Sequence, residues 1–511
     1  MKRSGVVVFL LSLFLCAFYI EGASEVCAAD DRLVVVTAWE TQGLDPLLSG
    51  FAFLRMGSVE PLVRSDRKGG VEPCLAEKWS LSDDRLTWKF DIRPNVLFHD
   101  GAPLTAAAAA QSLNRTLSKG AIFKGTPVKT IESDGNSVVI KTSSPFAPLP
   151  WYLATYSTVV LAPSSFDKNN ECVSVVGTGF YKLSSSEGNT VFDFEAFDGY
   201  WGEKATIEKA RYLAVPNPET RAMMAESGEG HIVIDLPAES AQYLAKDTDV
   251  IVVSHILPRV RSMILNAKLP VFADAELRRA VSLCIDRKGI AEAIHKDVTL
   301  AATQLLADFS PWHDKNLSPL EYNPEKAKEI FLASGWKPNK SGVLEKDGKE
   351  FAFEILTYTA RPDLPVVAQA IQQQLANLGI KVSIAIDNSS VIASRHNDGT
   401  LESALLGRNY SSIPDPIGNI AADFSEPRDP MGAMNWRSEK AESLIKSYMG
   451  ASNPQDAAKA RSGIMAILQE ELPVVPVSWY ANQSAFSKNL ENVNLDPYEL
   501  RPYPEGVRWK K

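Results

Sequence analysis

The sequence predicts an α/β fold, because stretches typical of strands and helices follow one another along the chain. Residues 210–215 form a β-type run, residues 218–228 form a helical stretch closed by a glycine, and residues 232–234 are again apolar. Strand, helix and strand in this order indicate an α/β lobe. A helical stretch over residues 364–378, followed by alternating apolar side chains over residues 380–386, shows the same pattern again.

The two ends of the chain also carry β-type segments. A short run over residues 33–36 comes first; we expect a loop over residues 47–55 and then a short helix over residues 59–63. Near the other end, residues 472–479 and 481–489 return to β-type side chains. Strands are therefore expected close to both termini.

A small α+β unit is predicted in the first third of the chain. Apolar and polar side chains alternate over residues 86–93, which is the period of a strand with one buried face. Asp100 and Gly101 supply a turn, and Thr105 can cap an alanine-rich helix that begins with residues 106–110. Strand, turn and helix together indicate an independent folded unit.

The N-terminus has the three-part layout of a secretory signal peptide. Basic residues precede an apolar run over residues 6–20, and small residues follow it. This run is too short and too early to favour a permanent membrane span. We expect cleavage after Ala28 or Ala29, which removes residues 1–29 and leaves a soluble exported protein. Lipidation at Cys16 is the alternative, although the residues before it make a poor lipoprotein box.

The charge of the chain argues against nucleic acid as a partner. The formal net charge is −9 at pH 7, and it stays there after cleavage because residues 1–29 hold two basic and two acidic side chains. No basic domain emerges, so nucleic-acid binding is not expected. The remaining length suffices for two or three domains, and no later segment is apolar for long enough to cross a membrane.

Catalytic and metal-binding motifs are missing from the sequence. It has no GxSxG, HExxH or phosphate-loop pattern. His99 and Asp100 form a pair that could be catalytic or metal-binding, but they lie in a strand-to-helix turn, where polar groups satisfy backbone donors. We therefore expect them to be scaffold. The other histidines show no helical pairing, so a dedicated transition-metal site is weakly supported, and no enzyme activity is expected.

Three cysteines remain after the signal region. Cys284 lies at helical spacing from apolar neighbours, which predicts a core position. Cys74 and Cys172 could pair in an oxidising compartment, but the sequence does not show whether they lie close enough. The disulfide therefore stays open.

Residues 75–105, read in order, resemble the signature segment of the family 5 extracellular solute-binding proteins, which serve peptide and nickel ABC importers. Residues 200–204 and 219–222 also match that family, and more closely its nickel-binding branch than its dipeptide branch. Residues 274–280 and 322–328 repeat motifs of its second lobe. The resemblance thus covers most of the chain.

This resemblance implies a two-lobed periplasmic binding protein of type II, cluster C-like, with an extra small α+β domain. Residues 30–69, 177–262 and 479–511 would form the first α/β lobe, residues 263–478 the second, and residues 70–176 the inserted domain. The C-terminal tail would cross back to the first lobe. Crossings of this kind form a hinge on which two lobes can close over a ligand.

The implied function is that of a periplasmic substrate-binding protein of an ABC transporter. It would capture a small polar ligand by hinge closure and present it to an inner-membrane permease and its ATPase. A nickel or other transition-metal chelate is the first ligand class, with the metal arriving as part of the ligand and no resident cofactor. A di- or oligopeptide is the alternative, and a secreted hydrolase is a remote one. The family is usually monomeric.

The segment after Leu406 corresponds to the family loop that reads the polar end of the ligand. In many peptide-binding members an aspartate just upstream of the pair Asp415 and Pro416 holds the amino group of the peptide. Here the nearby residues are Ser411 and Ser412. A cationic amino terminus has therefore lost its usual partner.

Arg408 is the cation that this segment offers, with Asn409 and Tyr410 beside it. Its guanidinium can grip a carboxylate with two donors; a salt bridge at the surface or between the lobes is the alternative. Two residues typical of the nickel-binding branch are absent, because residues 156–163 contain no arginine and residues 425–430 contain no histidine. The identity of the chelate is therefore open.

Aromatic and basic residues elsewhere complete the predicted site. In the opening segment the candidates are Phe51, Phe53 and Arg55, and in the inserted domain they are Trp151, Tyr152 and Tyr156; Trp436 could cover the pocket. Core packing is the alternative for the two phenylalanines and for both tryptophans.

Overall fold

A computed structural model describes residues 32–246 and 249–510 of the chain. The predicted signal peptide falls on residues outside this described part. The largest feature is a ten-stranded sheet with the strand order β10-β11-β12-β1-β13-β21-β14-β20-β18-β19. Its strands are β10 (Tyr181–Glu187), β11 (Val191–Ala196), β12 (Lys209–Ala214), β1 (Leu33–Thr37), β13 (Ile232–Val233), β21 (Val474–Ser487), β14 (Val250–Leu265), β20 (Ser403–Asn409), β18 (Ala352–Thr357) and β19 (Lys381–Ile386).

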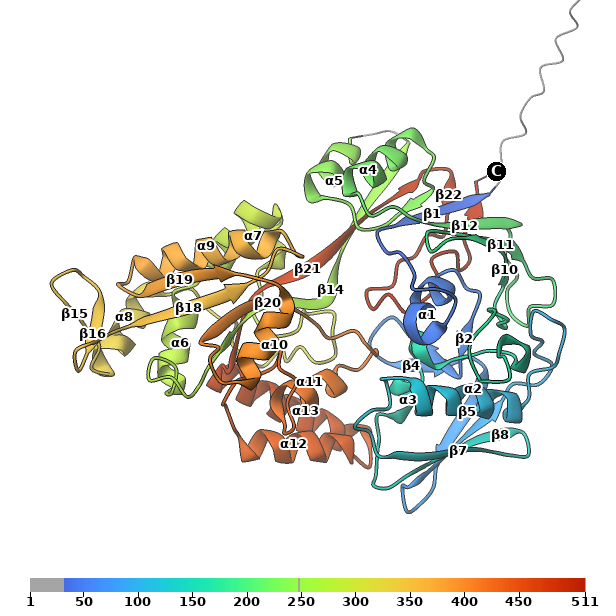
Figure 1. The fold of residues 1–511 in the computed structure, drawn as a ribbon, viewed down its shortest axis with the longest axis horizontal. Coiled ribbons are helices and arrows are strands. Elements are labelled where there is room, and N and C mark those ends of the chain that lie inside the picture. Colours follow the sequence, from blue (N-terminus) through green and yellow to red (C-terminus); the bar gives the residue numbers. More distant parts are fainter. Residues whose placement is uncertain (1–31, 247–248, 511) are drawn as a thin grey trace, which may run out of the picture. The chain divides into compact units, whose positions relative to one another are not determined.

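Strands β14 and β21 join two parallel groups within this sheet. They run antiparallel side by side, with register shifts between Leu257 and Val260 and between Arg261 and Ser262 (Figure 1). On one side of the pair, β1 lies parallel to β12 and β13; on the other, β18 lies parallel to β19 and β20. The β-type character predicted near both termini is confirmed by β1 and β21.

The helices predicted beside these strands are present. Helix α4 ends at Gly228, which adopts a left-handed φ of 79° as a helix-ending glycine does. Helix α9 precedes β19, as the alternating pattern predicted. The main helices are α4 (Pro218–Ser227), α5 (Ala238–Leu244), α6 (Ala275–Leu283), α7 (Arg287–His295), α8 (Pro324–Ala333), α9 (Asp363–Ala376), α10 (Ser389–Asn397), α11 (Ile417–Phe424), α12 (Glu439–Met449) and α13 (Pro454–Glu471).

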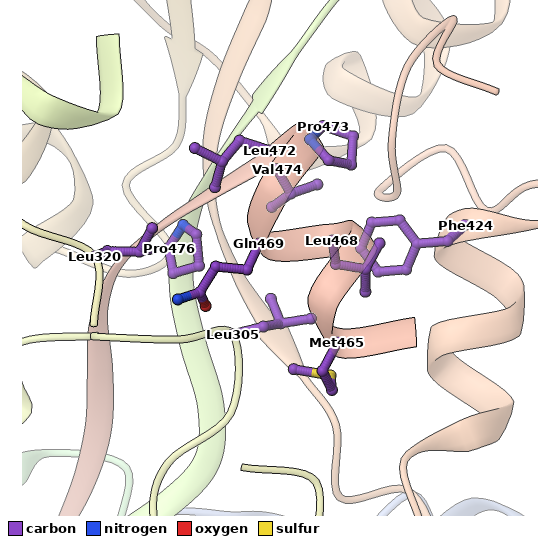
Figure 2. Close-up of a pocket in the computed structure, with 10 residues that line it drawn as sticks. All are labelled: Leu305, Leu320, Phe424, Met465, Leu468, Gln469, Leu472, Pro473, Val474 and Pro476. Atoms are coloured by element: carbon purple, nitrogen blue, oxygen red, sulfur yellow. The ribbon is translucent and has the colours of Figure 1, made fainter. Parts of the chain in front are cut away.

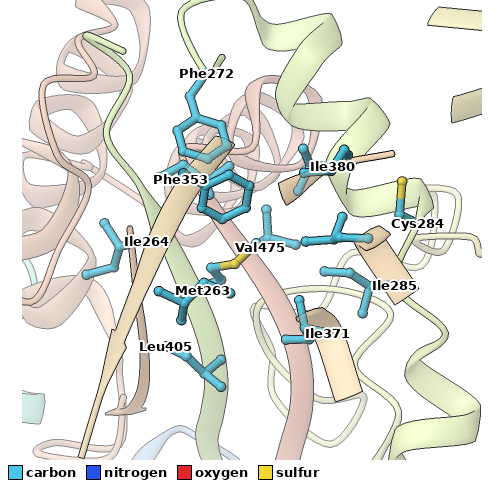
Figure 3. Packing of buried hydrophobic residues seen from close by; sticks show 14 of the residues in the cluster. Met263, Ile264, Phe272, Cys284, Ile285, Phe353, Ile371, Ile380, Leu405 and Val475 are labelled. Atoms are coloured by element: carbon cyan, nitrogen blue, oxygen red, sulfur yellow. The ribbon is translucent and has the colours of Figure 1, made fainter. Parts of the chain in front are cut away.

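The group around β18 is held by a large apolar core, shown in Figure 3. Phe272 and Phe353 meet edge to face with ring centroids 4.8 Å apart, and Ile371 and Val475 are fully buried in the same cluster. Cys284 also lies in this core, as its spacing predicted. Close packing of this kind fixes the positions at which β18 and β20 end.

The predicted α+β unit is confirmed as a four-stranded sheet covered by one helix. Thr105 caps α2, its hydroxyl accepting a hydrogen bond from the backbone N–H of Ala108, and α2 lies against the sheet (Figure 1). Trp88, Phe90 and Ile92 are buried on one face of β6, as their alternation requires. The elements are β5 (Ala76–Leu81), β6 (Thr87–Ile92), β8 (Ser137–Thr142), β7 (Val128–Asp134) and α2 (Ala106–Lys119).

The loop expected over residues 47–55 is instead helix α1 (Pro46–Arg55), so that prediction was wrong. The short helix expected over residues 59–63 is also wrong, because this segment holds strand β2 (Glu60–Pro61) and the start of strand β3 (Val63–Ser65). Asp45 caps this helix by accepting from the N–H of Leu47, and Pro46 occupies the first turn, where its missing N–H costs nothing. Arg115 of α2 also donates to both carboxylate oxygens of Asp45. The cap and the proline start the helix, and the ion pair between Arg115 and Asp45 holds its first turn.

Three cysteines in the described residues are free thiols. The sulfur of Cys74 lies 3.8 Å from a carboxylate oxygen of Glu60, and the sulfur of Cys172 lies 3.9 Å from the carbonyl oxygen of Leu44. The disulfide considered between Cys74 and Cys172 is not formed in this structure.

Candidate functional site

Topology marks one edge of the sheet as a place for a ligand. From the carboxyl end of β18 the chain passes through α9 to β19 on one side, and it later returns through α10 to β20 on the other side. In open α/β sheets ligands bind outside the carboxyl ends of the strands where the strand order reverses in this way. Residues 410–416, which follow β20, lie at this point.

A cavity of about 290 Å³ opens here. It collects side chains from segments that are far apart in the sequence: the loop after β1, helix α1, strand β14, the end of β20 and the C-terminal tail. Its lining residues are Trp39, Glu40, Gln42, Phe51, Arg55, Tyr156, Arg259, Asn409, Ser411, Ser412, Tyr498, Glu499 and Leu500.

A second cavity of about 460 Å³ adjoins the first, since Tyr156 and Ser412 line both. The inserted domain contributes more of its wall. Its other lining residues are Leu47, Ala121, Ile122, Lys124, Tyr152, Thr155, Ser157, Ile413, Gly418, Asn419 and Asp429. Volumes of this size are typical of sites for small ligands.

Two arginines and one carboxylate form the charged wall of the first cavity. Arg259 donates from Nη2 to Oε2 of Glu499, and Arg55 lies with its Nη2 3.5 Å from the same oxygen. The Nε of Arg55 also donates to the carbonyl oxygen of Glu499 at 3.1 Å. Glu499 thus joins the last residue of α1 to strand β14.

This cluster keeps Glu499 ionised and leaves positive charge in surplus. Burial alone raises the pKa of Glu499, but the charges of Arg55 and Arg259 outweigh burial and hold the pKa below its usual value. Of the three guanidinium nitrogens of Arg259, only Nη2 has a hydrogen-bond partner within the described residues. The Nε of Arg259 is buried and has none. A guanidinium in this position can accept a further anionic partner.

Aromatic rings surround the charged wall. Phe51 and Tyr156 meet edge to face with centroids 6.3 Å apart, and the guanidinium carbon of Arg55 lies 5.6 Å from the ring of Phe51. Trp39 lines the same cavity and is 46% exposed, so much of its indole is open to a ligand. Rings and guanidinium groups together suit a compact polar ligand with apolar faces.

Arg408 is engaged inside the protein. It donates from Nε and Nη2 to the two carboxylate oxygens of Asp423, and Nη2 lies 3.2 Å from Asp429. The hydroxyl of Tyr410 donates to Asp423 at 2.9 Å. Burial raises the pKa of Asp423 to about 6 although Arg408 opposes the shift. The donors that a ligand carboxylate would need are therefore in use, and ligand contact by Arg408 stays a prediction.

Several other predicted site residues pack away from both cavities. Phe53 is fully buried against Phe192, and Trp436 donates to a carboxylate oxygen of Glu471 at 2.7 Å. Trp151 donates from its indole N–H to the carbonyl oxygen of Gly69. These contacts correspond to the core-packing alternative named for each of the three residues.

Asp415 is also buried, and its carboxylate is fully used within the protein. It accepts from the indole N–H of Trp312 at 3.1 Å, from the hydroxyl of Tyr448 and from the backbone N–H of Ile417. Burial raises its pKa to about 6, while these hydrogen bonds lower it. Asp415 therefore shapes the loop before α11. The structure brings together the remaining predicted residues, which are Phe51, Arg55, Tyr152, Tyr156, Asn409, Ser411 and Ser412.

Sequence reasoning missed six polar or aromatic residues of the first cavity, namely Trp39, Glu40, Gln42, Arg259, Tyr498 and Glu499. Arg259 follows Pro258 inside a strand that is otherwise largely apolar on this face, and a charge in such a run could have been noticed. Glu499 had no usable signal, because its partner Arg55 lies 444 residues away.

His99 makes the contacts of a scaffold residue. Its Nε2 donates to the carbonyl oxygen of Gly179, and its Nδ1 accepts from the N–H of Gly177. Burial lowers the pKa of His99 to about 4, which keeps the ring neutral. Within the described ranges no group of three or more His, Cys, Asp or Glu side chains could hold a metal ion.

A separate apolar pocket beside β21 is too small to serve as a ligand site. Figure 2 shows Leu305, Leu468 and Pro476 among the side chains that enclose it. Its volume is about 10 Å³, which is close to the space that one water molecule needs.

Within residues 32–246 and 249–510, no helix combines the length and the hydropathy that a bilayer span requires.

Comparison with known proteins gives a consistent picture. Residues 70–429 match the family model described as bacterial extracellular solute-binding proteins, family 5. The nickel-binding periplasmic protein of Escherichia coli K12 is 26% identical over 517 residues, covering 96% of both chains. The oligopeptide-binding protein AppA of Bacillus subtilis is 23% identical over 461 residues, covering 85% of this chain and 83% of AppA.

A solved structure supports the fold. The structure of NikA from Brucella suis in complex with Fe(III)-EDTA superimposes with a TM-score of 0.82 at 22% identity, covering 93% of this chain and 100% of NikA. The predicted fold class, a two-lobed α/β binding protein with an extra small domain, is confirmed, and so is the family resemblance. The chain belongs to the bacterial extracellular solute-binding proteins of family 5.

Proposed function

We propose that this protein is the periplasmic substrate-binding component of an ABC importer and that its ligand is a nickel or other transition-metal chelate. The metal is cargo and arrives already held by its chelator. An inner-membrane permease and its ATPase would receive the ligand. The names of the nickel-binding relative and of the NikA complex support this ligand class.

The surplus positive charge around Arg259 carries the proposal. Two guanidinium groups share one carboxylate in the wall of a cavity that is otherwise aromatic and polar. A carboxylate of a chelator would complete the hydrogen bonding of Arg259, since hydrogen bonds between ions are the strong ones. Trp39, Phe51 and Tyr156 would pack against the faces of the complex.

The cavity offers less to the amino terminus of a peptide. Ser411 and Ser412 stand where peptide-binding relatives in many cases have an aspartate. Glu499 and Asp429 are already paired with arginines. Glu40, an exposed carboxylate of the first cavity, keeps a short peptide as the second candidate.

Closure of two lobes would follow from bending of β14 and β21. We infer the first lobe from residues 30–69, 177–262 and 479–511, the second from residues 263–478, and the inserted domain from residues 70–176. Arg259 on β14 and Asn409 on β20 are opposite each other in the sheet. A ligand bound between them and Trp39 would therefore contact both lobes and favour the closed form.

Titration calorimetry tests the ligand class. Purified protein would be titrated with nickel and L-histidine, with nickel and other chelators, and with dipeptides and longer peptides in metal-free buffer. We expect a chelate to bind in the submicromolar range and peptides to bind weakly. Tight binding of peptides without metal, together with failure of every chelate, would show that the ligand preference is wrong.

A further inference from the structure

The inference concerns the charge of the ligand, and it rests on the proposed function. We propose that Glu499 is a specificity-determining residue that limits the net negative charge of the ligand. It admits neutral and singly charged chelates and disfavours more highly charged polycarboxylate complexes.

Glu499 can respond to the charge of the ligand because both would contact the guanidinium group of Arg259. Its side chain is only 6% exposed, and its Oε2 accepts from Nη2 of Arg259, a residue that lines the cavity. In a guanidinium group Nη2 and Nε point along the same edge, so an anion that engages the remaining donors of Arg259 lies next to the carboxylate of Glu499. The two anions would repel each other at short range.

The charges of the first cavity sharpen this effect. Its lining includes two arginines, Arg55 and Arg259, and two carboxylates, Glu40 and Glu499. Glu40 is exposed and screened by solvent, so the cluster of Arg55, Arg259 and Glu499 keeps one positive charge in surplus. His255 would add a positive charge near Glu499 if it were protonated. Burial lowers the pKa of His255, so the ring stays neutral at neutral pH. One negative charge on the ligand can pair with the surplus positive charge at Arg259. A second negative charge would find no unpaired cation in this cluster. Because Glu499 is buried, solvent screens the repulsion weakly.

Glu505 provides a matched control on the same C-terminal tail. It too is a carboxylate held by arginines, accepting from Arg501 and Arg67 and lying 3.3 Å from Arg64. It lines neither of the two adjoining cavities. Replacing it therefore removes comparable ion pairs without changing the charge beside Arg259.

Two complexes of one chelator test the inference while ligand shape is held nearly constant. Iron(III)–EDTA carries one net negative charge and nickel(II)–EDTA carries two. In mildly acidic buffer of fixed ionic strength, wild-type protein should bind the iron complex about tenfold more tightly or better. In Glu499→Gln this ratio should fall to about one, and in Glu505→Gln it should stay at the wild-type value.

The neutral nickel complex of two L-histidine ligands checks that the Glu499→Gln site is intact, because its affinity should change by less than about threefold. Thermal unfolding followed by circular dichroism shows whether each variant is folded. The ratio of the two EDTA-complex affinities in wild type tests the inference without any variant. Equal binding of both EDTA complexes by wild type, or an unchanged ratio in Glu499→Gln, would overturn the inference. If wild type binds no chelate at all, whatever its charge, the proposed function itself fails and the inference fails with it.

Discussion

Two arginine–carboxylate clusters lie at the carboxyl end of β20 and the neighbouring middle part of β14, and they differ in their balance of charge. Around Arg408, one arginine faces two carboxylates, Asp423 and Asp429. Around Glu499, two arginines face one carboxylate. The first cluster has no cation to spare, whereas the second has one.

The pKa shifts follow the same difference. In the Arg408 cluster, burial raises the pKa of Asp423 and the neighbouring Asp429 adds to the shift. In the Glu499 cluster, the two arginines overcome burial and lower the pKa of the carboxylate. An arginine beside a cavity is therefore a candidate for ligand binding only when the surrounding carboxylates do not already neutralise it. By this criterion Arg259 is the better candidate for ligand binding, and we expect Arg408 to have a structural role.

The largest expected effect is on stability, from Arg408→Met. The variant leaves Asp423 buried without its ion partner, which should lower the free energy of unfolding by about 3–5 kcal/mol. Urea denaturation measures this loss. The double variant with Asp423→Asn should recover much of it, and ligand affinity of the folded protein should be nearly unchanged. Normal stability combined with lost binding would instead place Arg408 in the ligand site.

The next effect is on binding, from Arg259→Met. Loss of charged hydrogen bonds to the ligand should weaken affinity by about 1.5–3 kcal/mol, or roughly tenfold to a hundredfold. The ligand affinity of Arg259→Lys should lie between those of wild type and Arg259→Met, because lysine keeps the charge but lacks the paired donors of the guanidinium group. Calorimetry with the best chelate measures both. Unchanged affinity in Arg259→Met would remove this residue from the site.

Acid should act on the two clusters with opposite signs. The pKa of Glu499 is lowered, so its contribution is complete above the unfolded value of 4.5 and is lost as pH falls through the folded value. The pKa of Asp423 is raised from 3.8 to about 6, so its contribution is lost as pH rises across this interval.

Urea denaturation of wild type, Glu499→Gln and Asp423→Asn at a series of pH values checks these signs. For each variant, the difference from wild type in the free energy of unfolding should change by about 1–2 kcal/mol across the acid range. The advantage of wild type over Glu499→Gln should shrink as pH falls, and its advantage over Asp423→Asn should shrink as pH rises towards 6. Parallel curves for the two variants would contradict the comparison.

The smallest effect is expected at the aromatic wall. Trp39→Ala should weaken ligand binding by about 1 kcal/mol and leave the melting temperature almost unchanged, because Trp39 is 46% exposed. Trp436→Phe is the control: it should lower stability, since it breaks the hydrogen bond to Glu471, and it should leave affinity intact. The reverse pattern would exchange the roles of the two tryptophans.

Local patterns predicted much of the fold because they depend on residues close together in sequence. The alternation over residues 86–93 defined β6, and Thr105 marked the start of α2. The helix α1 was missed although Asp45 and Pro46 carry its start signals. The family resemblance implied a ligand-facing loop here, whereas half of the apolar and aromatic side chains of the segment are buried in the core.

The site was predicted only in part, since its charges come from distant segments. Asn409, Ser411 and Ser412 were found from the family resemblance, because they lie in the loop before Asp415 and Pro416, and all three line the first cavity. The engagement of Arg408 depends on α11, which carries Asp423, and the meeting of Arg55 with Glu499 depends on a tail that returns across the sheet. No local periodicity reports such contacts.

A crystal structure of the protein grown with nickel and its preferred chelator tests the central claim most directly, because anomalous scattering locates the metal without assumptions. The account predicts a nickel peak in the joined cavities near Tyr156 and Ser412, with a chelator carboxylate on Arg259 and the Arg408–Asp423 pair intact. A nickel peak outside these cavities, or a chelator carboxylate bound to Arg408 in place of Asp423, would contradict it.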